Sequence, residues 1–405
     1  MLYSPRCLSV VIPALNEEAG IADIATRVLA LRGLLAGVGV DGLELIVVDD
    51  GSTDRTAAVA AAIHGVRVIS HARNLGYGAA IKSGFRAASG DLLAFLDADG
   101  TYPPEGFGPM CRALLEGDAD VVVGSRMTAA SSQMPAVRRM GNLFFARLVN
   151  IIGATQVSDS ASGQRIVRRQ ALERLYPLPD GLNFTPVMTT RAIHEGLKMI
   201  EVPIRYTERV GRSKLSVLHD GRRFLTTILW TALGYNPARM LGMIGLWALA
   251  LAGLLGAGLV VLRSLGVQSL GPWGVASAFG VLVLSVAGIS IINTGIAFNY
   301  LVGLFSHRPV QQGLFGRPLL PGLDRQFGWL GLLAMAVGLV VAIASVHLGF
   351  SSWGITRLWL WLLGSALAIL MGLELVISWL LMRILEDLSV RELRTSEDLG
   401  TPFHE

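Results

Sequence analysis

Residues 45–54 read LIVVDDGSTD and residues 91–100 read DLLAFLDADG, two apolar runs that each end in closely spaced aspartates. A continuous run of Val, Ile, Leu and Phe is typical of a strand buried on both faces of a parallel sheet. Open α/β sheets bind their ligands in the crevice at the carboxyl ends of such strands. The two stretches therefore predict an α/β fold with aspartates at its ligand-binding edge.

The second acidic cluster has the spacing of a metal site. Asp97 and Asp99 alternate around the small residue Ala98, so both carboxylates can turn toward one hard cation. Mg²⁺ is usually held by one or two carboxylates, and substrate phosphates and water fill its other positions. The pair predicts a site for Mg²⁺ or Mn²⁺ that binds together with a nucleoside diphosphate.

Apolar spacing predicts that strands and helices alternate along the first third of the chain. We expect strands at residues 8–12, 43–49, 66–70, 92–97 and 121–124, and helices at 21–35, 53–63, 78–88 and 105–115. Ser52 or Thr53 is expected to cap the second helix. The alternation predicts a right-handed, mostly parallel sheet with flanking helices. After Arg126 it ends, and residues 158–165 and 201–206 are expected to be loops.

The second half of the chain has the composition of a membrane protein. Hydrophobic residues make up 52% of the whole sequence and charged residues only 16%, and most of the charges precede residue 235. Four long apolar stretches follow, at residues 240–262, 275–305, 327–348 and 358–382. Each exceeds the ~20 residues that cross a bilayer as a helix. Core helices of a large soluble protein are the alternative, which four such stretches in series disfavour.

Charge placement predicts the orientation of these spans. We expect no signal peptide, because Arg6 and Cys7 lead directly into the first strand. The connection after the second span and the C-terminal tail carry most of the loop arginines, which are Arg308, Arg317, Arg325, Arg383, Arg391 and Arg394. The other two connections hold mainly Arg263 and Arg357. By the positive-inside rule we expect a multi-pass protein of the cell membrane whose first domain and C-terminus are cytoplasmic. Two cysteines, Cys7 and Cys111, are too few for a disulfide framework and suit a reducing compartment.

Two segments read as basic amphipathic helices. Residues 137–152 and 215–233 mix arginines with large apolar side chains, which favours helices that lie on the membrane interface. The alternative is that they pack against the first domain. A Gly- and Ser-containing turn just before the second segment gathers Arg209, Arg212, Ser213 and Lys214. Such a cluster is suited to a lipid phosphate, and attraction to anionic headgroups is the alternative.

Two shorter stretches could contact a nucleotide. Residues 13–18 read PALNEE after the first strand, where short polar groups could hold a base and ribose, although an acidic first helical turn is the alternative. Residues 73–80 read RNLGYGAA and match a dinucleotide-binding fingerprint poorly. They suit a helix N-terminus near a phosphate, with Lys82 one turn further on. The alternative for Lys82 is a solvated helix face.

Taken together and in order, these motifs resemble those of family-2 glycosyltransferases with the GT-A fold. The similarity is to the type of dolichyl-phosphate mannosyltransferase and bacterial polyprenyl-phosphate glycosyltransferases, and it covers residues 8–235. It rests on residues 11–17, 48–52, 74–76, 97–99, 159–163 and 211–214. Two positions depart from the family pattern. Gly100 and Thr101 follow Asp99 where the family often has Leu-Gln, and Gln164 replaces the Phe of Ser-Gly-Phe-Arg.

The resemblance implies a Rossmann-like GT-A domain and a reaction. We expect a catalytic domain at residues 1–213, an interfacial helix and linker at 214–236, a four-helix transmembrane domain at 237–385 and a cytoplasmic tail at 386–405. The implied reaction moves one sugar, with inversion, from a UDP- or GDP-sugar to a polyprenyl phosphate of the dolichyl or undecaprenyl type. The product would be a polyprenyl-phosphate monosaccharide.

The resemblance also implies roles for individual residues. Nucleotide-sugar contacts would come from Pro13, Asn16, Glu17, Asp49, Asp50, Lys82, Asp97 and Gln164. The acceptor phosphate would be held by Arg209, Arg212, Ser213 and Lys214. Asp97 and Asp99 would bind Mg²⁺ or Mn²⁺ on the leaving diphosphate, and Arg126 or Arg165 would add a second cation. Asp159 would orient groups at the junction of sugar and acceptor.

Two other classes of function stay open at this point. A processive polysaccharide synthase shares the acidic motifs, but the Gln-x-x-Arg-Trp sequence of such synthases is missing here. A transporter or scaffold could bind nucleotide sugar without turnover, and Glu374, Asn293 and Asn299 lie within predicted spans where polar residues are often functional. Helix or subunit contacts are the alternative for these three. Glycines of the first span, Gly253, Gly256 and Gly258, would allow the close helix approach of a homo-oligomer. We expect no nucleic-acid partner.

Overall fold

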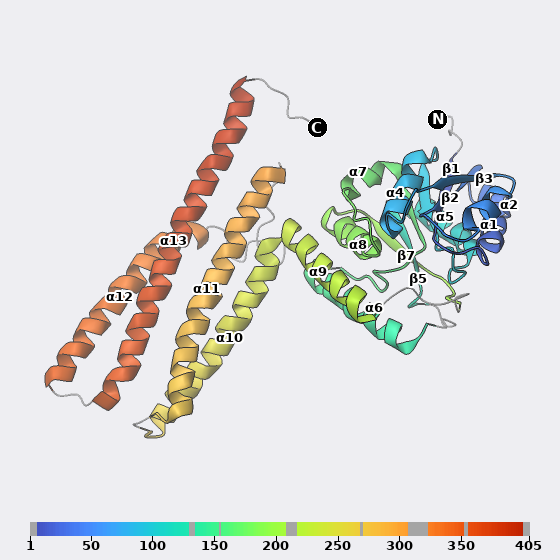
Figure 1. The fold of residues 1–405 in the computed structure, drawn as a ribbon. Helices are drawn as coiled ribbons and strands as arrows, with labels where there is room; N and C mark the ends of the chain where they lie inside the picture. The colour runs from blue at the N-terminus through green and yellow to red at the C-terminus, as the bar shows by residue number, and fades with distance from the viewer. Residues whose placement is uncertain are drawn as a thin grey trace. The chain divides into compact units, whose positions relative to one another are not determined.

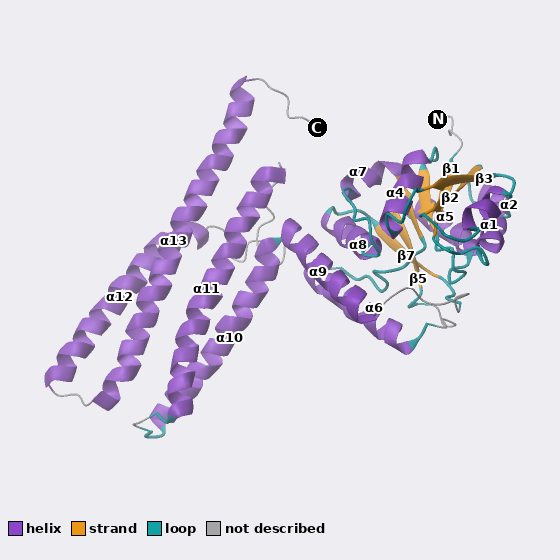
Figure 2. Cartoon of the chain, in the orientation of Figure 1, coloured by secondary structure: helices purple, strands orange, loops and turns teal. Residues whose placement is uncertain are grey.

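The fold was analysed in a computed structural model (Figure 1). It describes residues 6–128, 134–153, 155–207, 217–267, 270–306, 323–351 and 355–399. The chain divides into two compact units, Met1–Ala232 and Leu233–Glu405. The first unit contains a β-sheet with helices on both faces, and the second consists of helices (Figure 2).

The first unit is built on a seven-stranded sheet in the order β3-β2-β1-β4-β6-β5-β7. Its strands are β1 (Cys7–Ala14), β2 (Gly42–Asp49), β3 (Val66–Ser70), β4 (Leu92–Phe95), β5 (Val121–Ser125), β6 (Arg165–Arg168) and β7 (Met199–Pro203). All neighbours pair in parallel except β6, which is antiparallel to both β4 and β5. The expected mostly parallel α/β sheet is confirmed.

Two of the seven strands lie where loops were expected. β6 begins at Arg165, inside the stretch 158–165, and β7 covers Glu201 and its neighbours. β6 is only four residues long, with arginine at both ends, and β7 is half-buried and ends at Pro203. Neither has the long apolar run that marks β1 and β2. Their pairing depends on neighbouring strands that are distant in the sequence, so local periodicity could not reveal them.

The helices of the first unit follow the expected alternation, with shifted ends. They are α1 (Ile21–Leu29), α2 (Arg32–Ala36), α3 (Thr56–Ala61), α4 (Tyr77–Ala87), α5 (Phe107–Glu116) after the short 3₁₀ helix η1 (Pro104–Gly106), α6 (Ala136–Gly153), α7 (Arg169–Leu175), α8 (Phe184–His194) and α9 (Val217–Tyr235). The helix expected at 21–35 breaks in two. The cap expected at Ser52 or Thr53 is wrong, because α3 begins later and the Asp54 carboxylate accepts from the Thr56 amide (3.0 Å).

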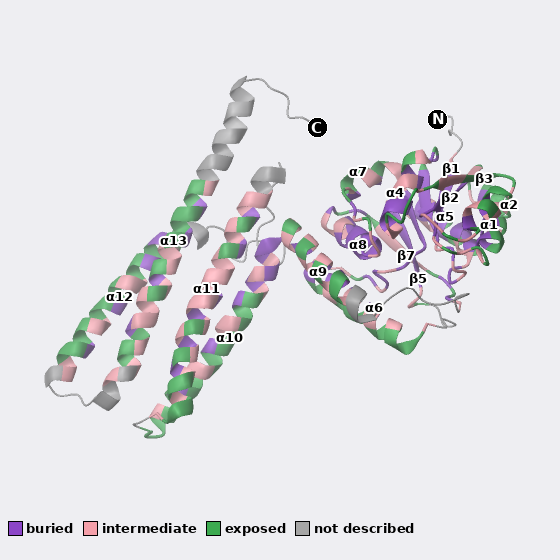
Figure 3. Cartoon of the chain, in the orientation of Figure 1, coloured by how far each residue is buried: buried purple, intermediate pink, exposed green. Residues whose placement is uncertain are grey.

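Both faces of the sheet are buried, which explains the continuous apolar runs. Leu8, Val10 and Ile12 of β1 join one hydrophobic core, whereas Val11 between them joins the other. β2 alternates in the same way. The buried residues of the first unit accordingly gather along the strands and the helix faces next to them (Figure 3). A two-layered core of this kind holds the carboxyl ends of β1, β2 and β4 in a fixed register.

The second unit contains four helices that are long and apolar enough to cross a membrane. They are α10 (Pro237–Ser264), α11 (Pro272–Ser306), α12 (Leu323–Ser351) and α13 (Ile355–Leu399). The expected four apolar helices are confirmed, and many of their large side chains are exposed, as a lipid-facing surface requires (Figure 3).

Glycines bring these helices together in pairs. A Cβ added to Gly331 of α12 would lie 2.6 Å from the Gly372 carbonyl oxygen of α13, and the reverse holds for Gly372. Gly245 and Gly288 make the equivalent close approach between α10 and α11. Within the described residues, Gly253, Gly256 and Gly258 make no such close contact: Gly253 and Gly258 meet nothing within 4 Å, and Gly256 has only ordinary contact with Val281. Their part in a homo-oligomer stays a prediction.

Candidate active site

The two aspartates of the second acidic cluster lie on the loop that leaves β4, and a hydroxyl group donates to each. The Tyr77 phenol donates to Asp97 Oδ1 (2.6 Å). Asp99 Oδ1 accepts from the Thr101 amide (3.1 Å) and from Thr101 Oγ1 (2.5 Å). Both aspartates are half-buried. Their carboxylates are thus oriented before any ligand binds.

A second loop packs against Asp97. A Cβ added to Gly163 would lie 2.7 Å from the Asp97 carboxylate carbon, so only glycine allows this approach. The Gly163 amide donates to the Tyr102 hydroxyl (2.8 Å), which fixes the backbone at this point. The loop of residues 159–164 therefore forms a wall of the Asp97–Asp99 site.

These residues suit a small divalent cation only in combination with a ligand. Among the described residues, no three His, Cys, Asp or Glu side chains form a group that could hold a metal by themselves. Asp97 and Asp99 supply two oriented carboxylates on one short loop. Mg²⁺ and Mn²⁺ accept such oxygen ligands and take their other positions from phosphates and water. The site therefore fits Mg²⁺ or Mn²⁺ that arrives with a diphosphate.

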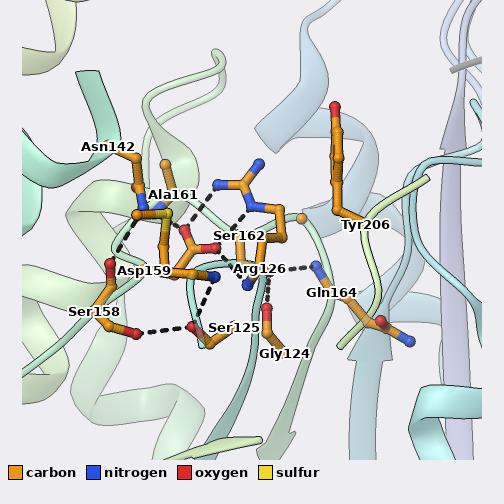
Figure 4. A network of polar contacts seen from close by, with 12 residues as sticks. Gly124, Ser125, Arg126, Asn142, Ser158, Asp159, Ala161, Ser162, Gln164 and Tyr206 are labelled. Atoms are coloured by element: carbon orange, nitrogen blue, oxygen red, sulfur yellow. Dashed lines mark hydrogen bonds and ion pairs between the residues drawn. The ribbon is translucent and has the colours of Figure 1, made fainter. Parts of the chain in front are cut away.

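The loop of residues 159–164 binds an arginine at its other end, through Asp159. Arg126 follows β5, and its guanidinium forms a two-pronged ion pair with Asp159, with Nε and a terminal nitrogen each 2.7 Å from a carboxylate oxygen (Figure 4). The Arg126 amide also donates to Asp159 (3.0 Å). The Asp159 side chain is 0% exposed and that of Arg126 is 13% exposed. Arg126 thus helps to bury Asp159, and Asp159 in turn fixes the orientation of the Arg126 guanidinium.

Two tyrosine rings flank this arginine. The Arg126 guanidinium carbon lies 5.6 Å from the Tyr102 ring centroid and 5.8 Å from that of Tyr206. Burial by itself would raise the pKa of Asp159, but the charge of Arg126 outweighs it and holds that pKa below its ordinary value. Burial by itself would lower the pKa of Arg126, but the charge of the Asp159 carboxylate outweighs this effect and raises that pKa. The pair is therefore fully ionised at neutral pH.

A dense set of contacts fixes the loop that carries Asp159. Glu201 of β7 accepts from the Ser158 and Asp159 amides (both 2.9 Å), and Ser162 Oγ donates to the Gly124 carbonyl (2.6 Å). Arg165 is fully buried, and its guanidinium donates to the carbonyls of Ser160 and Ser162 and to Thr189. Burial lowers the pKa of Arg165 to about 10. Of the two arginines considered as the second cation, only Arg126 has an accessible side chain.

The first acidic cluster supports the second one. The buried Asp50 carboxylate accepts from the Leu75 and Gly76 amides (both 2.9 Å) and contacts His71 Nδ1 (2.7 Å). Leu75 and Gly76 directly precede Tyr77, the partner of Asp97. Asp50 therefore holds the turn that positions the Tyr77 phenol.

The residues expected to contact the nucleoside lie on two joined loops. Pro13 is buried in β1, and Asn16 and Glu17 follow that strand. The Asn16 amide donates to Ser52 Oγ (2.9 Å), and Asn16 Oδ1 accepts from the Thr53 amide (2.8 Å). The Glu17 amide donates to Thr56 Oγ1 (2.8 Å), and the Asp49 carboxylate accepts from the Ser52 amide (3.2 Å). The ends of β1 and β2 are thereby brought together, as the parallel register requires.

Lys82 and Gln164 have internal partners in this structure. The Lys82 ammonium pairs with Asp180 (2.6 Å) and donates to the Leu178 carbonyl (2.9 Å). The Asp180 carbonyl also accepts from the Ala79 amide in the first turn of α4 (3.1 Å). Gln164 is fully buried and donates to the Pro103 carbonyl (2.9 Å), while its Oε1 has no hydrogen-bond partner among the residues that the structure describes.

The residues expected to hold the acceptor phosphate, Arg209, Arg212, Ser213 and Lys214, lie outside the described residues. The last described residue before them, Thr207, contacts the loop that carries Asp97 and Asp99. The Thr207 amide donates to the Thr101 carbonyl (3.1 Å), and its hydroxyl donates to the Gly100 carbonyl (2.8 Å). Thr207 is only two residues before Arg209, so the chain leaves the described segment beside Asp99.

Both expected amphipathic segments are helices, α6 and α9, and they lie side by side in the first unit (Figure 1). The rings of Phe145 and Phe224 pack at 5.8 Å between them. One face of α6 is buried, whereas Met140 on the same helix is 70% exposed, as is Trp230 of α9. Packing against the first domain and an exposed apolar surface therefore occur together.

Sequence reasoning missed the aromatic and hydroxyl residues around the carboxylates. Tyr77, Tyr102, Tyr206 and Glu201 stood out by neither spacing nor composition, because single polar residues at strand and helix ends have many ordinary roles. Thr101 did carry a signal, since it departs from the family pattern two residues after Asp99.

Two families match the two halves of the chain separately. Residues 9–176 match the family described as Glycosyl transferase family 2, and residues 237–396 match a domain of unknown function, DUF8752. A low-salt glycan biosynthesis hexosyltransferase of Haloferax volcanii is 35% identical over 60% of this chain, and the match spans only 59% of that relative's length.

Two further relatives are matched over most of their length. A dolichyl-phosphate hexose transferase of Haloferax volcanii is 32% identical over 54% of this chain and 91% of its own. An undecaprenyl-phosphate 4-deoxy-4-formamido-L-arabinose transferase of Aeromonas hydrophila is 27% identical over 74% of this chain and 90% of its own. Among solved structures, glucosyl-3-phosphoglycerate synthase of Mycobacterium tuberculosis with Mn²⁺, UDP and phosphoglyceric acid has 27% identity and a TM-score of 0.44, over 56% of this chain and 78% of that one.

Proposed function

The chain belongs to glycosyl transferase family 2, and on that premise we propose that it moves one sugar from a nucleoside diphosphate sugar to a polyprenyl phosphate. The product is a polyprenyl-phosphate monosaccharide with inverted anomeric configuration, and nucleoside diphosphate is released. Relatives named for dolichyl and undecaprenyl phosphate support the lipid acceptor, as do the four apolar helices of the second unit.

One observation of the site carries this proposal. The loop of residues 159–164 touches the Asp97 carboxylate through Gly163 and the Arg126 guanidinium through Asp159. It therefore links a two-carboxylate loop, suited to a cation on a leaving diphosphate, to an oriented arginine suited to a phosphate. Phosphate on both sides of the reacting carbon is what transfer to a lipid phosphate requires.

The donor is held at the carboxyl ends of β1, β2 and β4. The loops after β1 and β2, with Asn16, Glu17 and Asp49, contact the nucleoside, and Asp97 and Asp99 would hold a divalent cation that arrives with the diphosphate. A bound Mg²⁺ or Mn²⁺ acts as a Lewis acid that offsets the charge of the leaving group. Asp50 acts through the turn that precedes Tyr77.

The acceptor needs to be positioned rather than activated. A phosphate monoester has its second pKa near ~6, so it is mostly dianionic at neutral pH and needs no general base. One acceptor oxygen forms the bond to the anomeric carbon, and the bond from that carbon to the donor diphosphate breaks with its electron pair. Arg126, Arg209, Arg212 and Lys214 orient the two phosphates. Asp159 orients Arg126 and takes no proton.

We expect the lipid product to contain one phosphate. Full-length protein in membranes, incubated with polyprenyl phosphate and a panel of UDP- and GDP-sugars, should form a sugar–monophosphate–lipid in mass spectra. Nucleoside diphosphate, and not nucleoside monophosphate, should appear in equal amount. A sugar–diphosphate–lipid would contradict the proposal, a polymer would indicate a processive synthase, and no product with any donor would favour a scaffold or transporter.

We expect Arg212→Ala and Lys214→Ala to weaken use of the lipid phosphate. A charge-assisted hydrogen bond contributes about 1.5–3 kcal/mol, so each change should lower kcat/KM for the lipid roughly tenfold or more. Binding of nucleotide sugar should change much less. Both substrates' kinetics should be measured in neutral and in anionic bilayers, because full rescue by anionic lipid would assign the turn to headgroup attraction instead.

The same bilayers address the placement of α6 and α9. We propose that their exposed apolar side chains, including Met140, Phe144 and Trp230, lie in the membrane interface with the arginines of both helices among the headgroups. This arrangement, with the first unit and the C-terminus on the cytoplasmic side, would place the site next to a lipid phosphate.

A further inference from the structure

In the candidate metal site, Tyr77 donates a hydrogen bond to one carboxylate oxygen of Asp97, and Thr101 donates to one carboxylate oxygen of Asp99. The phenol meets Asp97 Oδ1 at 2.6 Å, and the threonine hydroxyl meets Asp99 Oδ1 at 2.5 Å. The two donors come from different parts of the fold, the start of α4 and the loop after β4. Both are neutral groups, so they direct the carboxylates without cancelling their charge.

The Tyr77 phenol is held in place by the backbone that precedes it. The Asp50 carboxylate fixes the Leu75 and Gly76 amides, and Gly76 has a φ of 108°, a conformation that favours glycine. The phenol is therefore held where it donates to Asp97 Oδ1 (2.6 Å).

Thr101 is fixed just as firmly. The residue is 2% exposed, and its carbonyl accepts from the Thr207 amide (3.1 Å). The Thr101 amide and hydroxyl both approach the same oxygen of Asp99. A ligand that used both oxygens of this carboxylate would have to compete with two donors.

We propose that Tyr77 and Thr101 are positioning residues that make Asp97 and Asp99 bind the cation through one oxygen each, and so select Mg²⁺ or Mn²⁺ against Ca²⁺. The inference rests on the proposed metal-assisted transfer. Mg²⁺ takes six ligands in near-ideal octahedral geometry, whereas Ca²⁺ takes six to eight and often binds carboxylates through both oxygens. A pair of carboxylates with one oxygen already engaged suits the smaller ion.

The test measures ion binding rather than turnover. Mn²⁺ is titrated into full-length protein in detergent with UDP or GDP present, and free Mn²⁺ is followed by electron paramagnetic resonance. Ca²⁺ is then added as the competitor. Loss of a residue that hydrogen-bonds a metal ligand typically lowers metal affinity about 10–100-fold. We expect Tyr77→Phe and Thr101→Val to weaken Mn²⁺ binding about tenfold or more and to weaken Ca²⁺ binding much less.

Two further variants separate positioning from general damage. Thr101→Ser keeps a hydroxyl and should restore the preference for Mn²⁺. Thr190→Val removes a buried hydroxyl that donates to the Pro186 carbonyl within α8 and not to either aspartate, and should leave the preference unchanged. An unchanged Mn²⁺ to Ca²⁺ ratio in both Tyr77→Phe and Thr101→Val, or equal weakening of both ions, would overturn the inference. Selective Mn²⁺ binding by a wild-type protein that forms no lipid product would remove the proposed transfer and leave this inference standing.

Discussion

Asp99→Asn should lower sugar transfer by roughly a hundredfold or more while the fold stays intact. The substitution removes one negative charge at the cation but keeps the side-chain volume and the oxygen that accepts from Thr101. A metal ion on the leaving group supplies several kcal/mol of transition-state stabilisation, and each ~1.4 kcal/mol is a factor of ten in rate. The measurement is the initial rate of lipid product with saturating donor, with and without chelator.

A matched control lies just before the strand that leads to Asp99. Asp91 is exposed at the opposite end of β4, so Asp91→Asn removes the same charge far from the ligand-binding edge and should retain transfer. Chelator should inactivate the wild-type and Asp91→Asn proteins alike. Full activity of the wild-type protein in chelator, or of Asp99→Asn in its absence, would rule out the metal-assisted mechanism.

Asp159→Asn should have the largest effect on stability among the site residues. It leaves the Arg126 guanidinium with an uncompensated charge in a nearly closed environment. Breaking a buried ion pair by removing one partner typically costs about 3–5 kcal/mol. Thermal unfolding of the full chain in detergent should show a clearly lower midpoint, and transfer should fall because Arg126 loses its orientation.

The double variant Arg126→Met with Asp159→Leu separates the two effects. Removing both charges together should recover most of the stability, since apolar replacements of a buried pair are often neutral. Transfer should stay low, because the cation for the phosphate is gone. Wild-type stability of Asp159→Asn, combined with complete loss of transfer, would instead point to a direct chemical role for Asp159.

The pH dependence of this stability has a definite sign. The folded-state pKa of Asp159 lies below the ordinary value of ~3.9, because Arg126 outweighs the effect of burial. The stabilisation is therefore complete above about pH 4 and is lost as the pH falls through the lowered folded-state pKa. The stability difference between wild-type and Asp159→Asn proteins should be constant near neutral pH and shrink in strong acid.

The sequence by itself determined the elements that have a strong local signal. The long apolar runs of β1 and β2 predicted buried parallel strands, because a strand covered on both faces needs no polar alternation. The four spans of the second unit were equally clear, since few other structures tolerate such length and composition. β6 and β7 were not predictable in this way, because their short sequences become strands only when β4 and β5 pair with them.

Only the tertiary structure decided what each carboxylate does. From the sequence, all three of Asp50, Asp99 and Asp159 were expected at the ligand site, as a nucleotide-sugar contact, a metal ligand and an orienting group. In the fold, Asp50 holds the turn before Tyr77, Asp159 pairs with Arg126, and Asp99 accepts from Thr101 on the loop suited to a cation. These partners are separated by between two and 33 residues along the chain. Sequence spacing places a side chain at the end of a strand, but which loops meet there depends on strand order, and strand order is set by packing of the whole sheet.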